Sequence, residues 1–561
     1  MPVQQRVRTS GRRQFIARAA QASAAASLAA WLPSRASALR GSSDVADNTL
    51  TLAWDAVPPS FDTQANPDPA TTSFACAVMS GLLRFRLDPD PEVSARHALE
   101  PDLAASWEAP DASHWILHLR PDATFQSIPP VNGRPVESED VRASFTRQAG
   151  IAQSQNRAVA AMFDAPAIDT PDPQTVIFRL PRPYAPLAQF LASVPEGLVF
   201  PREALAGAYD PAVQMIGSGP FYLGSYVGGV GETLRRNAGY FDQGLPYLDG
   251  VQQKINPDEA SRRAQFTAGN LDVVRVGESS LATITAANPN AQVVKAISDR
   301  NYAIFFQLGP GPPLFLDARL RQAVSEAIDR DAIGQAIYAG QYQLAFGANL
   351  SMGSAALRSG DLNPRVQRAH TFDPADAAML LRAAGYGYGQ LDLTLAYPSG
   401  AFGAEFDTMA KMIGDMLAAV FGNVTLLPID YTRDYLGGGS GYRYGNFPRD
   451  TLVLGSVYPY QTVDQYVVEN YRAPHSPSTA DTVQDPQLDA MLGQARALPD
   501  PTLTQQSYLD IQQYLAERLW SVGGLPAGYT YTLLQRWVQN YSAPPEAYSA
   551  GRAWRTAQIH A

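Results

Sequence analysis

Apolar and polar positions follow two different periods along the chain. Residues 48–54 alternate, with Leu50 and Leu52 on one face, which predicts a half-buried strand, and residues 391–395 have the same period. Asp373 and Pro374 predict the start of a helix that ends at Gly385, because aspartate caps helices and proline fits the first helical position. Strands and helices in this order favour the α/β class with mixed sheets.

A longer apolar stripe predicts a second helix, which leads into a strand over residues 424–429. The residues that recur on its one face are Phe406, Met409, Ile413, Met416, Leu417 and Val420. The stretch 97–185 differs, because it contains short strands at 115–119 and 175–180 separated by proline-rich turns. We interpret this stretch as an inserted α+β domain.

The pattern of polar and apolar residues predicts two more helices. Ser138 is expected to cap a helix whose first turn holds Glu139 and Asp140, which complement the helix dipole. Leu320, Val324, Ala327 and Ile328 have the spacing of a core-facing helix. We expect its solvated side to carry Arg319, Arg321 and Glu326.

The first forty residues have the composition of a targeting segment. They hold seven arginines and no acid, and Arg12 and Arg13 form a twin-arginine pattern. The apolar run 22–32 that follows is too short to span about 30 Å of hydrocarbon, and Ala36-Ser37-Ala38 fits a cleavage site. We therefore predict a twin-arginine signal peptide over residues 1–38 and a periplasmic location. Its removal takes six arginines from a chain of net charge −10, which leaves −16.

Composition excludes several kinds of partner and site. An acidic chain of 561 residues gives no electrostatic support for nucleic acid or an anionic membrane. The single cysteine, Cys76, excludes a disulfide framework, and the six histidines are scattered. His114 and His118 share one face of a predicted strand about 13 Å apart, too far to chelate one ion. No nucleophile elbow, dinucleotide fingerprint or zinc-protease motif is present, so we expect no cofactor, metal or catalytic residue.

Nine short stretches occur in a fixed order and are specific together. They are PPSFDTQ (58–64), SGLLRF (80–85), LEPDLAASWE (99–108), WILHLRPDATF (115–125), SEDVRASF (138–145), GSGPFYL (217–223), RNAGYFDQGLPYLDGV (236–251), DARLRQAVSEAIDRDAI (317–333) and FDPADAAMLLRAAGY (372–386). Their order and spacing resemble the extracytoplasmic solute-binding proteins of the peptide, nickel and opine family, family 5, the receptors of ABC importers.

The resemblance implies a two-lobed periplasmic-binding-protein fold of type II, cluster C, with an extra α+β domain in the first lobe. We expect residues 39–85 and 215–303 to form the first lobe, 86–214 the inserted domain and 304–524 the second lobe. Residues 525–561 would return to the first lobe. Such a protein captures a solute between its lobes and delivers it to an ABC permease in the inner membrane. We expect a monomer.

The family's amine anchor is missing. Peptide-binding relatives usually present Gly-Trp-x-x-Asp-Tyr in the second lobe, and its aspartate pairs with the ligand's amino group. Here residues 455–460 read Gly-Ser-Val-Tyr-Pro-Tyr, so Ser456 and Pro459 replace the tryptophan and the aspartate. A buried ammonium without a partner is costly, which lowers the expectation of ordinary peptides. Asp464 or Asp68 would be substitutes.

The resemblance and the residue types together suggest a set of ligand-binding candidates. Tyrosines offer stacking faces and hydroxyl groups, Arg443 suits a carboxylate, and relatives contact an extended ligand near Asn66 and Asp68. The candidates are Tyr458, Tyr460, Gln461, Asn66, Asp68, Arg443, Tyr444 and Tyr529. The alternative is that half of the tyrosines pack the sheet edge and that Arg443 is solvated. The ligand stays open among peptides, sugars, aromatic acids and opines.

Two other classes of protein compete with an importer subunit. One is an exported hydrolase or another enzyme, for which the sequence offers no recognisable set of catalytic residues. The other is a chemosensory receptor that reports a bound solute, which the sequence does not distinguish from an importer subunit.

Overall fold

The computed structural model describes residues 48–66, 68–88, 98–151, 167–309, 314–458, 460, 462–472, 484–544 and 550–560. The twin-arginine segment lies outside these ranges. Within them, we find no helix with the length and hydropathy that a membrane span requires.

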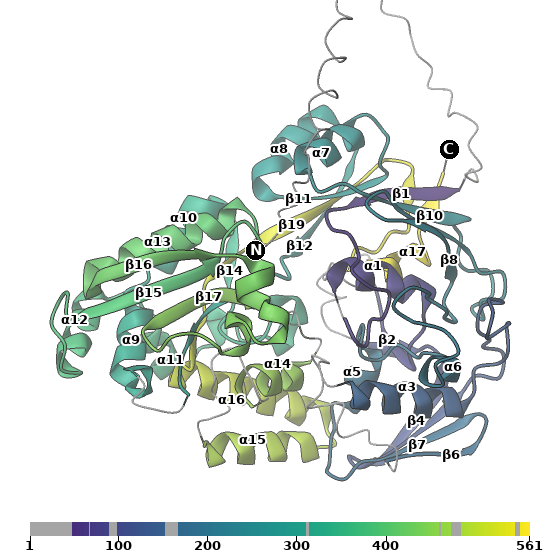
Figure 1. Ribbon diagram of the computed structural model, residues 1–561, viewed down its shortest axis with the longest axis horizontal. Coiled ribbons are helices and arrows are strands. Elements are labelled where there is room, and N and C mark those ends of the chain that lie inside the picture. The colour runs from purple at the N-terminus through teal and green to yellow at the C-terminus, as the bar shows by residue number, and fades with distance from the viewer. Residues whose placement is uncertain are drawn as a thin grey trace, which may run out of the picture. The chain divides into compact units, whose positions relative to one another are not determined.

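The first sheet brings together strands from both ends of the chain. Its central strand β1 (Thr49–Trp54) pairs in parallel with β10 and β11, and Leu50 and Leu52 point into the core. The other strands are β8 (Phe221–Val227), β9 (Gly231–Arg236), β10 (Gly250–Ile255), β11 (Val273–Gly277), β12 (Gln292–Ile297), β14 (Tyr342–Leu344) and β19 (Pro526–Leu534). The helices of this part are α1 (Pro69–Val78), α7 (Glu259–Thr267), α8 (Glu278–Ala287) and α17 (Gly551–Trp554), and Figure 1 shows α7 and α8 beside β11.

The second sheet has the strand order β16-β15-β17-β13-β18. These strands are β13 (Asn301–Phe306), β15 (Leu391–Pro398), β16 (Gly422–Ile429), β17 (Thr451–Val457) and β18 (Ser521–Val522). Its α-helices are α9 (Ala318–Glu326), α10 (Arg330–Tyr338), α11 (Pro364–Ala369), α12 (Pro374–Ala383), α13 (Ala404–Phe421), α14 (Val463–Tyr471), α15 (Pro486–Ala497) and α16 (Pro501–Arg518). The predicted stripe lies on α13, where Phe406, Met409 and Ile413 are fully buried.

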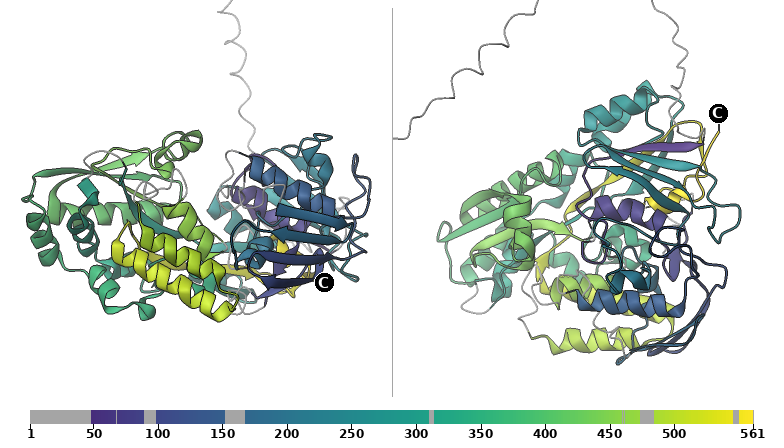
Figure 2. Two further views of the ribbon diagram at one scale, coloured as in Figure 1. Left: turned by 90° about the horizontal axis from the view of Figure 1, so that it is seen from below. Right: turned by 45° about the vertical axis from the view of Figure 1, so that its right-hand side comes forward.

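A third, antiparallel sheet has the order β4-β5-β7-β6. It contains β4 (Ala104–Asp111), β5 (His114–Leu119), β6 (Ile168–Asp172) and β7 (Thr175–Arg179), and its helices are α3 (Ser138–Gly150), α5 (Leu187–Ala192) and α6 (Arg202–Leu205). Figure 2 shows its strands together as one dark blue layer with α3 against them. Two short ladders complete the described strands, β2 (Leu83–Phe85) with β3 (Leu99–Pro101) and β20 (Val538–Gln539) with β21 (Gln558–Ile559).

Two large hydrophobic cores divide the molecule into two lobes. One core gathers buried residues from the first and third sheets, and the other gathers residues between 297 and 527 around the second sheet. The chain passes between the lobes at 297–301 and at 522–526. These passages lie side by side, because β12 pairs with β19 in one lobe and β13 pairs with β18 in the other. The two-lobed α/β fold is thus confirmed.

Two local expectations are wrong. Glu137 is the cap of α3, and its backbone N–H is accepted by the carboxylate of Asp140 at 2.9 Å, so Ser138 is the first helical residue. Arg321 and Glu326 are buried on α9. Arg321 donates to the carbonyl oxygens of Phe315 and Arg518 at 2.7 and 2.9 Å, because its long side chain reaches the exposed carbonyl end of α16.

Glu232 is an acid buried under α1. It lies opposite Gln253 in the β9–β10 ladder, and both side chains are 2% exposed. Among the described residues, neither carboxylate oxygen of Glu232 has a hydrogen-bond partner, nor has the amide oxygen of Gln253. Burial raises the pKa of Glu232 to about 8. The folded state therefore binds this proton more tightly than the unfolded chain, and it loses stability as the pH rises from about 4.5 to 8.

Replacing Glu232 by glutamine should raise the stability of the protein at alkaline pH. A glutamine amide is uncharged and supplies a donor for Gln253, so we expect a gain of about 1–3 kcal/mol at pH 8. The gain should shrink toward pH 5, where Glu232 is already protonated. Urea unfolding at the two pH values measures the difference, and an equal effect at both would contradict the assignment.

Candidate functional site

The first lobe contributes the N-terminal end of α1. Asp68 caps this helix, since its carboxylate accepts the Ala70 N–H at 2.8 Å, and Pro69 takes the first helical position. Burial raises the pKa of Asp68. Asn66 lies in the preceding turn and donates its backbone N–H to the carbonyl oxygen of Asp62 at 2.8 Å. The cap thus holds a partly desolvated carboxyl at the end of the helix.

The second lobe contributes a short helical segment after the strand β16. This segment contains η6 (Tyr431–Leu436) and η8 (Tyr442–Tyr444), which places Arg443 beside Tyr435 and Tyr444. The guanidinium Nη2 of Arg443 donates to the hydroxyl of Tyr460 at 3.5 Å. No carboxylate of the described residues lies within ion-pair distance of Arg443. The arrangement leaves a half-buried cation beside three phenol groups, with the carboxyl of Glu469 within electrostatic range.

Tyr458 and Tyr460 have different roles in the structure. Their rings lie 5.1 Å apart, but Tyr460 is 5% exposed and packs in the second core, whereas Tyr458 is half-buried. Burial raises the pKa of both hydroxyls. Tyr460 therefore presents only its hydroxyl, to Arg443, and Tyr458 presents its ring.

Electrostatic effects connect these groups across the lobes. Burial raises the pKa of Tyr458, and the charges of Glu196 and Asp68, both in the first lobe, raise it further. The charge of Asp68 also raises the pKa of Tyr431. The structure therefore groups Arg443, Tyr444, Tyr458 and Tyr460 in the second lobe, and it places Asp68 of the first lobe within electrostatic range of Tyr458.

Other candidates lie outside this group. Gln461 and Pro459 fall outside the described residues. Tyr529 lies on β19, where its hydroxyl accepts from Gln343 at 3.0 Å and the ammonium of Lys295 lies 3.8 Å from its ring. Its described contacts therefore connect it to β14 and β12.

Asp464 is already neutralised. Arg496 binds it in bidentate geometry at 2.8 and 2.9 Å, and the hydroxyl of Tyr508 donates to it at 2.8 Å. The first lobe reaches this ion pair, because the backbone N–H of Ala185 donates to the carbonyl oxygen of Arg496 at 2.8 Å and the Tyr184 ring lies 5.5 Å from the guanidinium. Asp464 is thus part of an inter-lobe contact and not a free anchor for an amine.

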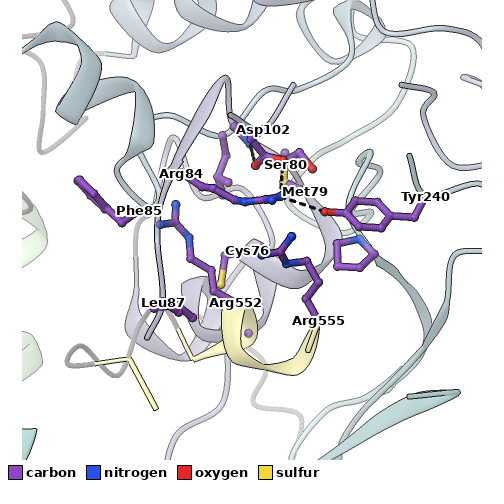
Figure 3. Close-up of a pocket in the computed structure, with 14 residues that line it drawn as sticks. Cys76, Met79, Ser80, Arg84, Phe85, Leu87, Asp102, Tyr240, Arg552 and Arg555 are labelled. Atoms are coloured by element: carbon purple, nitrogen blue, oxygen red, sulfur yellow. Dashed lines mark hydrogen bonds and ion pairs between the residues drawn. The ribbon is translucent and has the colours of Figure 1, made fainter. Parts of the chain in front are cut away.

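A cavity in the first lobe is closed by ion pairs (Figure 3). Arg84 bridges Glu100, Asp102 and Asp242, and Arg555 joins Asp242 at 2.6 Å. The volume is about 30 Å³, room for about two water molecules. Cys76 lines it, and burial raises the pKa of this thiol to about 11. This cavity is too small for an organic solute, and its charges hold the C-terminal helix α17 against β2 and β3.

The two histidines of β5 are on its outer face. His114 contacts Asp111 at 2.9 Å and His118 contacts Glu108 at 3.4 Å, all with well-exposed side chains. No group of three or more histidine, cysteine or acidic side chains in the described part of the chain has the arrangement of a metal site.

Comparison with known proteins gives the family of this two-lobed chain. The model of the bacterial extracellular solute-binding proteins, family 5, matches residues 98–460. The chain belongs to that family. The match covers the third sheet, most of the first sheet and the candidate residues of the second lobe up to Tyr460.

Curated relatives of this family 5 protein include two transport proteins. A probable D,D-dipeptide-binding periplasmic protein of Escherichia coli is 29% identical over 46% of this chain and 49% of its own length. A putative ABC transporter peptide-binding protein of Brucella ovis is 27% identical over 61% of this chain and 62% of its own length. The chain thus matches 49% and 62% of the length of these two relatives, less than two thirds in each case.

Solved structures share the fold of this family 5 protein over nearly its whole length. A periplasmic binding protein of Agrobacterium tumefaciens in complex with agropinic acid has a TM-score of 0.75 at 22% identity and covers 91% of this chain and 99% of its own. The murein tripeptide binding protein of Escherichia coli has a TM-score of 0.73 at 19% identity, with 92% and 100% coverage.

Glu196, Tyr431, Tyr435 and Glu469 join the site without a sequence signal. Glu196 follows α5, and Tyr431 opens η6, so no local pattern connects them. Only the pairing of the two lobes brings Glu196 near Tyr458, whereas Tyr431, Tyr435 and Glu469 lie in the same lobe as Tyr458.

Replacing Asp464 by asparagine should destabilise the second lobe. It leaves Arg496 without its buried partner, so we expect a loss of about 3 kcal/mol. Asp489→Asn, which removes the more exposed carboxylate facing Arg472, is the control and should change stability little. Urea unfolding followed by tryptophan fluorescence compares them, and equal midpoints for the two variants would contradict the structural role.

Proposed function

We propose that this family 5 protein is the periplasmic solute-binding subunit of an ABC importer. It captures a solute between its lobes and delivers it, unchanged, to a permease of the inner membrane. Its similarity to peptide-binding transport proteins supports this, as does its likeness to a binding protein in complex with agropinic acid. We further propose that the protein acts as a monomer and catalyses no reaction.

The single observation that carries the proposal is the meeting of both lobes around Tyr458. The charges of Asp68 and Glu196 act on this side chain from the first lobe, while Tyr460, whose hydroxyl accepts from Arg443, lies beside it in the second. A solute that contacts both lobes stabilises the closed form only, which shifts the equilibrium between open and closed states. About 5.5 kcal/mol of differential binding moves that equilibrium from 1:99 to 99:1.

Arg443 gives the proposed site a preference for acids. A half-buried guanidinium that has no carboxylate partner among the described residues gains most from a bidentate carboxylate supplied by the solute. Tyr458 supplies a ring face for stacking, and the hydroxyl of Tyr460 holds the guanidinium in place. We therefore propose that the solute carries a carboxylate group next to an apolar or planar part.

Arg443→Met should weaken binding of such a solute at least tenfold, because a charge-assisted hydrogen bond is lost. A thermal-shift screen of peptides, sugars and aromatic acids identifies the solute, and calorimetry measures the affinity. Arg365→Met, which removes an exposed arginine from the same lobe, is the matched control. Mass spectrometry should recover the bound solute intact. Turnover of any bound compound, or equal affinity of both variants, would overturn the assignment.

Export through the twin-arginine route is a separate part of the proposal. Replacing Arg12 and Arg13 by lysine should leave the uncleaved precursor in the cytoplasm, because the paired arginines are the recognised signal. Cell fractionation and the mass of the mature N-terminus measure this. Arg6→Lys with Arg8→Lys is the control, and its export should be normal. Normal export of the Arg12 and Arg13 variant would point to another route.

A further inference from the structure

The lobes also meet at a point away from the two chain passages that join them. Tyr184 and Ala185 lie in the loop before α5 of the first lobe, and they contact Arg496 at the end of α15 in the second lobe. In the view of Figure 1, α15 and α16 lie at the lower edge, well below β12 and β19, which lead into the passages. A rotation of one lobe about the passages therefore separates these residues.

The first lobe holds its side of this contact in place. The backbone N–H of Tyr184 donates to the carbonyl oxygen of Ala112 at 2.7 Å, and the side chain of Tyr184 is fully buried. Three prolines within residues 181–186 restrict the backbone on both sides of it. The loop is thus a firm support from which the N–H of Ala185 reaches the other lobe.

The second lobe offers an acceptor at the end of a helix. The carbonyl oxygens in the last turn of an α-helix have no partner within the helix, and they carry a partial negative charge. The carbonyl oxygen of Arg496 lies in the last turn of α15, and it accepts the N–H of Ala185 at 2.8 Å. The guanidinium of the same residue lies 5.5 Å from the centre of the Tyr184 ring, which is within the range of a cation–π contact.

The ion pair behind this contact keeps Arg496 in position. Its guanidinium binds the buried carboxylate of Asp464 at 2.8 and 2.9 Å, and the hydroxyl of Tyr508 donates to the same carboxylate at 2.8 Å. These three residues all belong to the second lobe, so their bonds persist when the lobes separate. Opening therefore breaks the Ala185 hydrogen bond and the Tyr184 ring contact but leaves the ion pair intact.

We propose that Tyr184, Ala185 and Arg496 form a latch, which favours the closed arrangement of the lobes without supplying a group to the solute. Both partners of each latch interaction belong to the protein, so the latch acts whatever the solute is. Its effect on capture rests on the proposed function, because a larger closed fraction lowers the apparent dissociation constant of a solute that binds the closed form. Tyr184 and Arg496 are then positioning residues for binding.

Hydrogen exchange of the purified protein tests the latch. Prolines have no amide N–H, so within residues 181–186 only Arg182, Tyr184 and Ala185 exchange. The Tyr184 amide is bonded within the first lobe, whereas the Ala185 amide is bonded across the lobes. Mass spectrometry with residue resolution should find both amides protected. An Ala185 amide that exchanges as fast as an unstructured one overturns the latch, even where a variant does not fold.

Tyr184→Leu and Arg496→Lys weaken the latch from either lobe. Leucine stays apolar but removes the ring, and lysine keeps a charge for Asp464 but removes the planar guanidinium. Each should speed exchange of the Ala185 amide about threefold or more, the size of a lost cation–π contact, and leave the amide of residue 184 unchanged. Separation of the lobes exposes Ala185 alone, whereas local unfolding of the loop exposes both amides, so equal acceleration of the two contradicts the latch.

Two further variants serve as controls. Tyr184→Phe keeps the ring beside Arg496 and should keep the protection of Ala185. Tyr209→Leu makes the same change as Tyr184→Leu at another tyrosine buried in the first lobe, where the charges that act on the hydroxyl come from that lobe. It should leave the exchange of Ala185 unchanged, and faster exchange in this variant would assign the effect to general destabilisation of the lobe.

Solute affinity separates the latch from the proposed function. The probes are Ala-Tyr, 4-hydroxybenzoate and agropinic acid, each of which carries a carboxylate for Arg443. Tyr184→Leu should raise the dissociation constant of a probe that binds about threefold or more, mainly through faster dissociation. An unaltered dissociation constant overturns the role of the latch in capture but keeps the proposed function. Binding of none of the three probes counts against the proposed solute class, and the exchange of Ala185 still decides the latch.

Discussion

Two neighbouring passages of the chain, at 297–301 and 522–526, join the two lobes, and this constraint governs the rest of the structure. Each lobe buries its own apolar residues, so neither core needs the other for its packing. Few backbone dihedrals then separate one arrangement of the lobes from another. Gly524, with φ of 71°, lies in the second passage, where a side chain would strain the backbone and meet the ring of Phe346.

The described side-chain contacts between the lobes that we analyse are polar. The contact of Tyr184 and Ala185 with Arg496 surrounds a satisfied ion pair, whereas Arg443 has no carboxylate partner and the Oε1 atom of Glu469 has no hydrogen-bond partner among the described residues. The two kinds of contact differ in the free energy that a bound solute would gain from them. A satisfied pair gains little more from a solute, but an unpartnered charge gains a great deal. We therefore expect a solute to gain most of its binding energy at charges that have no ion-pair partner among the described residues.

The sequence predicts the elements well, because periodicity and capping are local. Asp373 and Pro374 start α12, and the stripe from Phe406 to Val420 lies on α13. Prediction from the sequence fails where a long side chain donates to a carbonyl oxygen far away in the chain, as Arg321 does at the end of α16. A charged residue on a helix is predicted to be solvated unless its partner is known. The partner of Arg321 is the carbonyl oxygen of Arg518, about two hundred residues away in the sequence.

The candidate site shows the same limit. The family resemblance suggested Tyr458 and Tyr460, which occupy the family's ligand loop, and Asp68, which lies where relatives contact an extended ligand. Arg443 was suggested by its residue type alone. Neither clue pointed to Glu196 or Glu469, because their proximity depends on how two lobes meet. Asp464 was a candidate to bind an amine because of its sequence position, yet Arg496 and Tyr508 already donate hydrogen bonds to its carboxylate oxygens.

The buried thiol of Cys76 has a practical consequence for following lobe motion. It is the only cysteine of the chain, it lies beneath Arg552 in a water-sized cavity, and its raised pKa keeps it in the unreactive thiol form. Maleimide dyes attached to one introduced cysteine on each lobe would therefore report the distance between them without labelling the native sulfur.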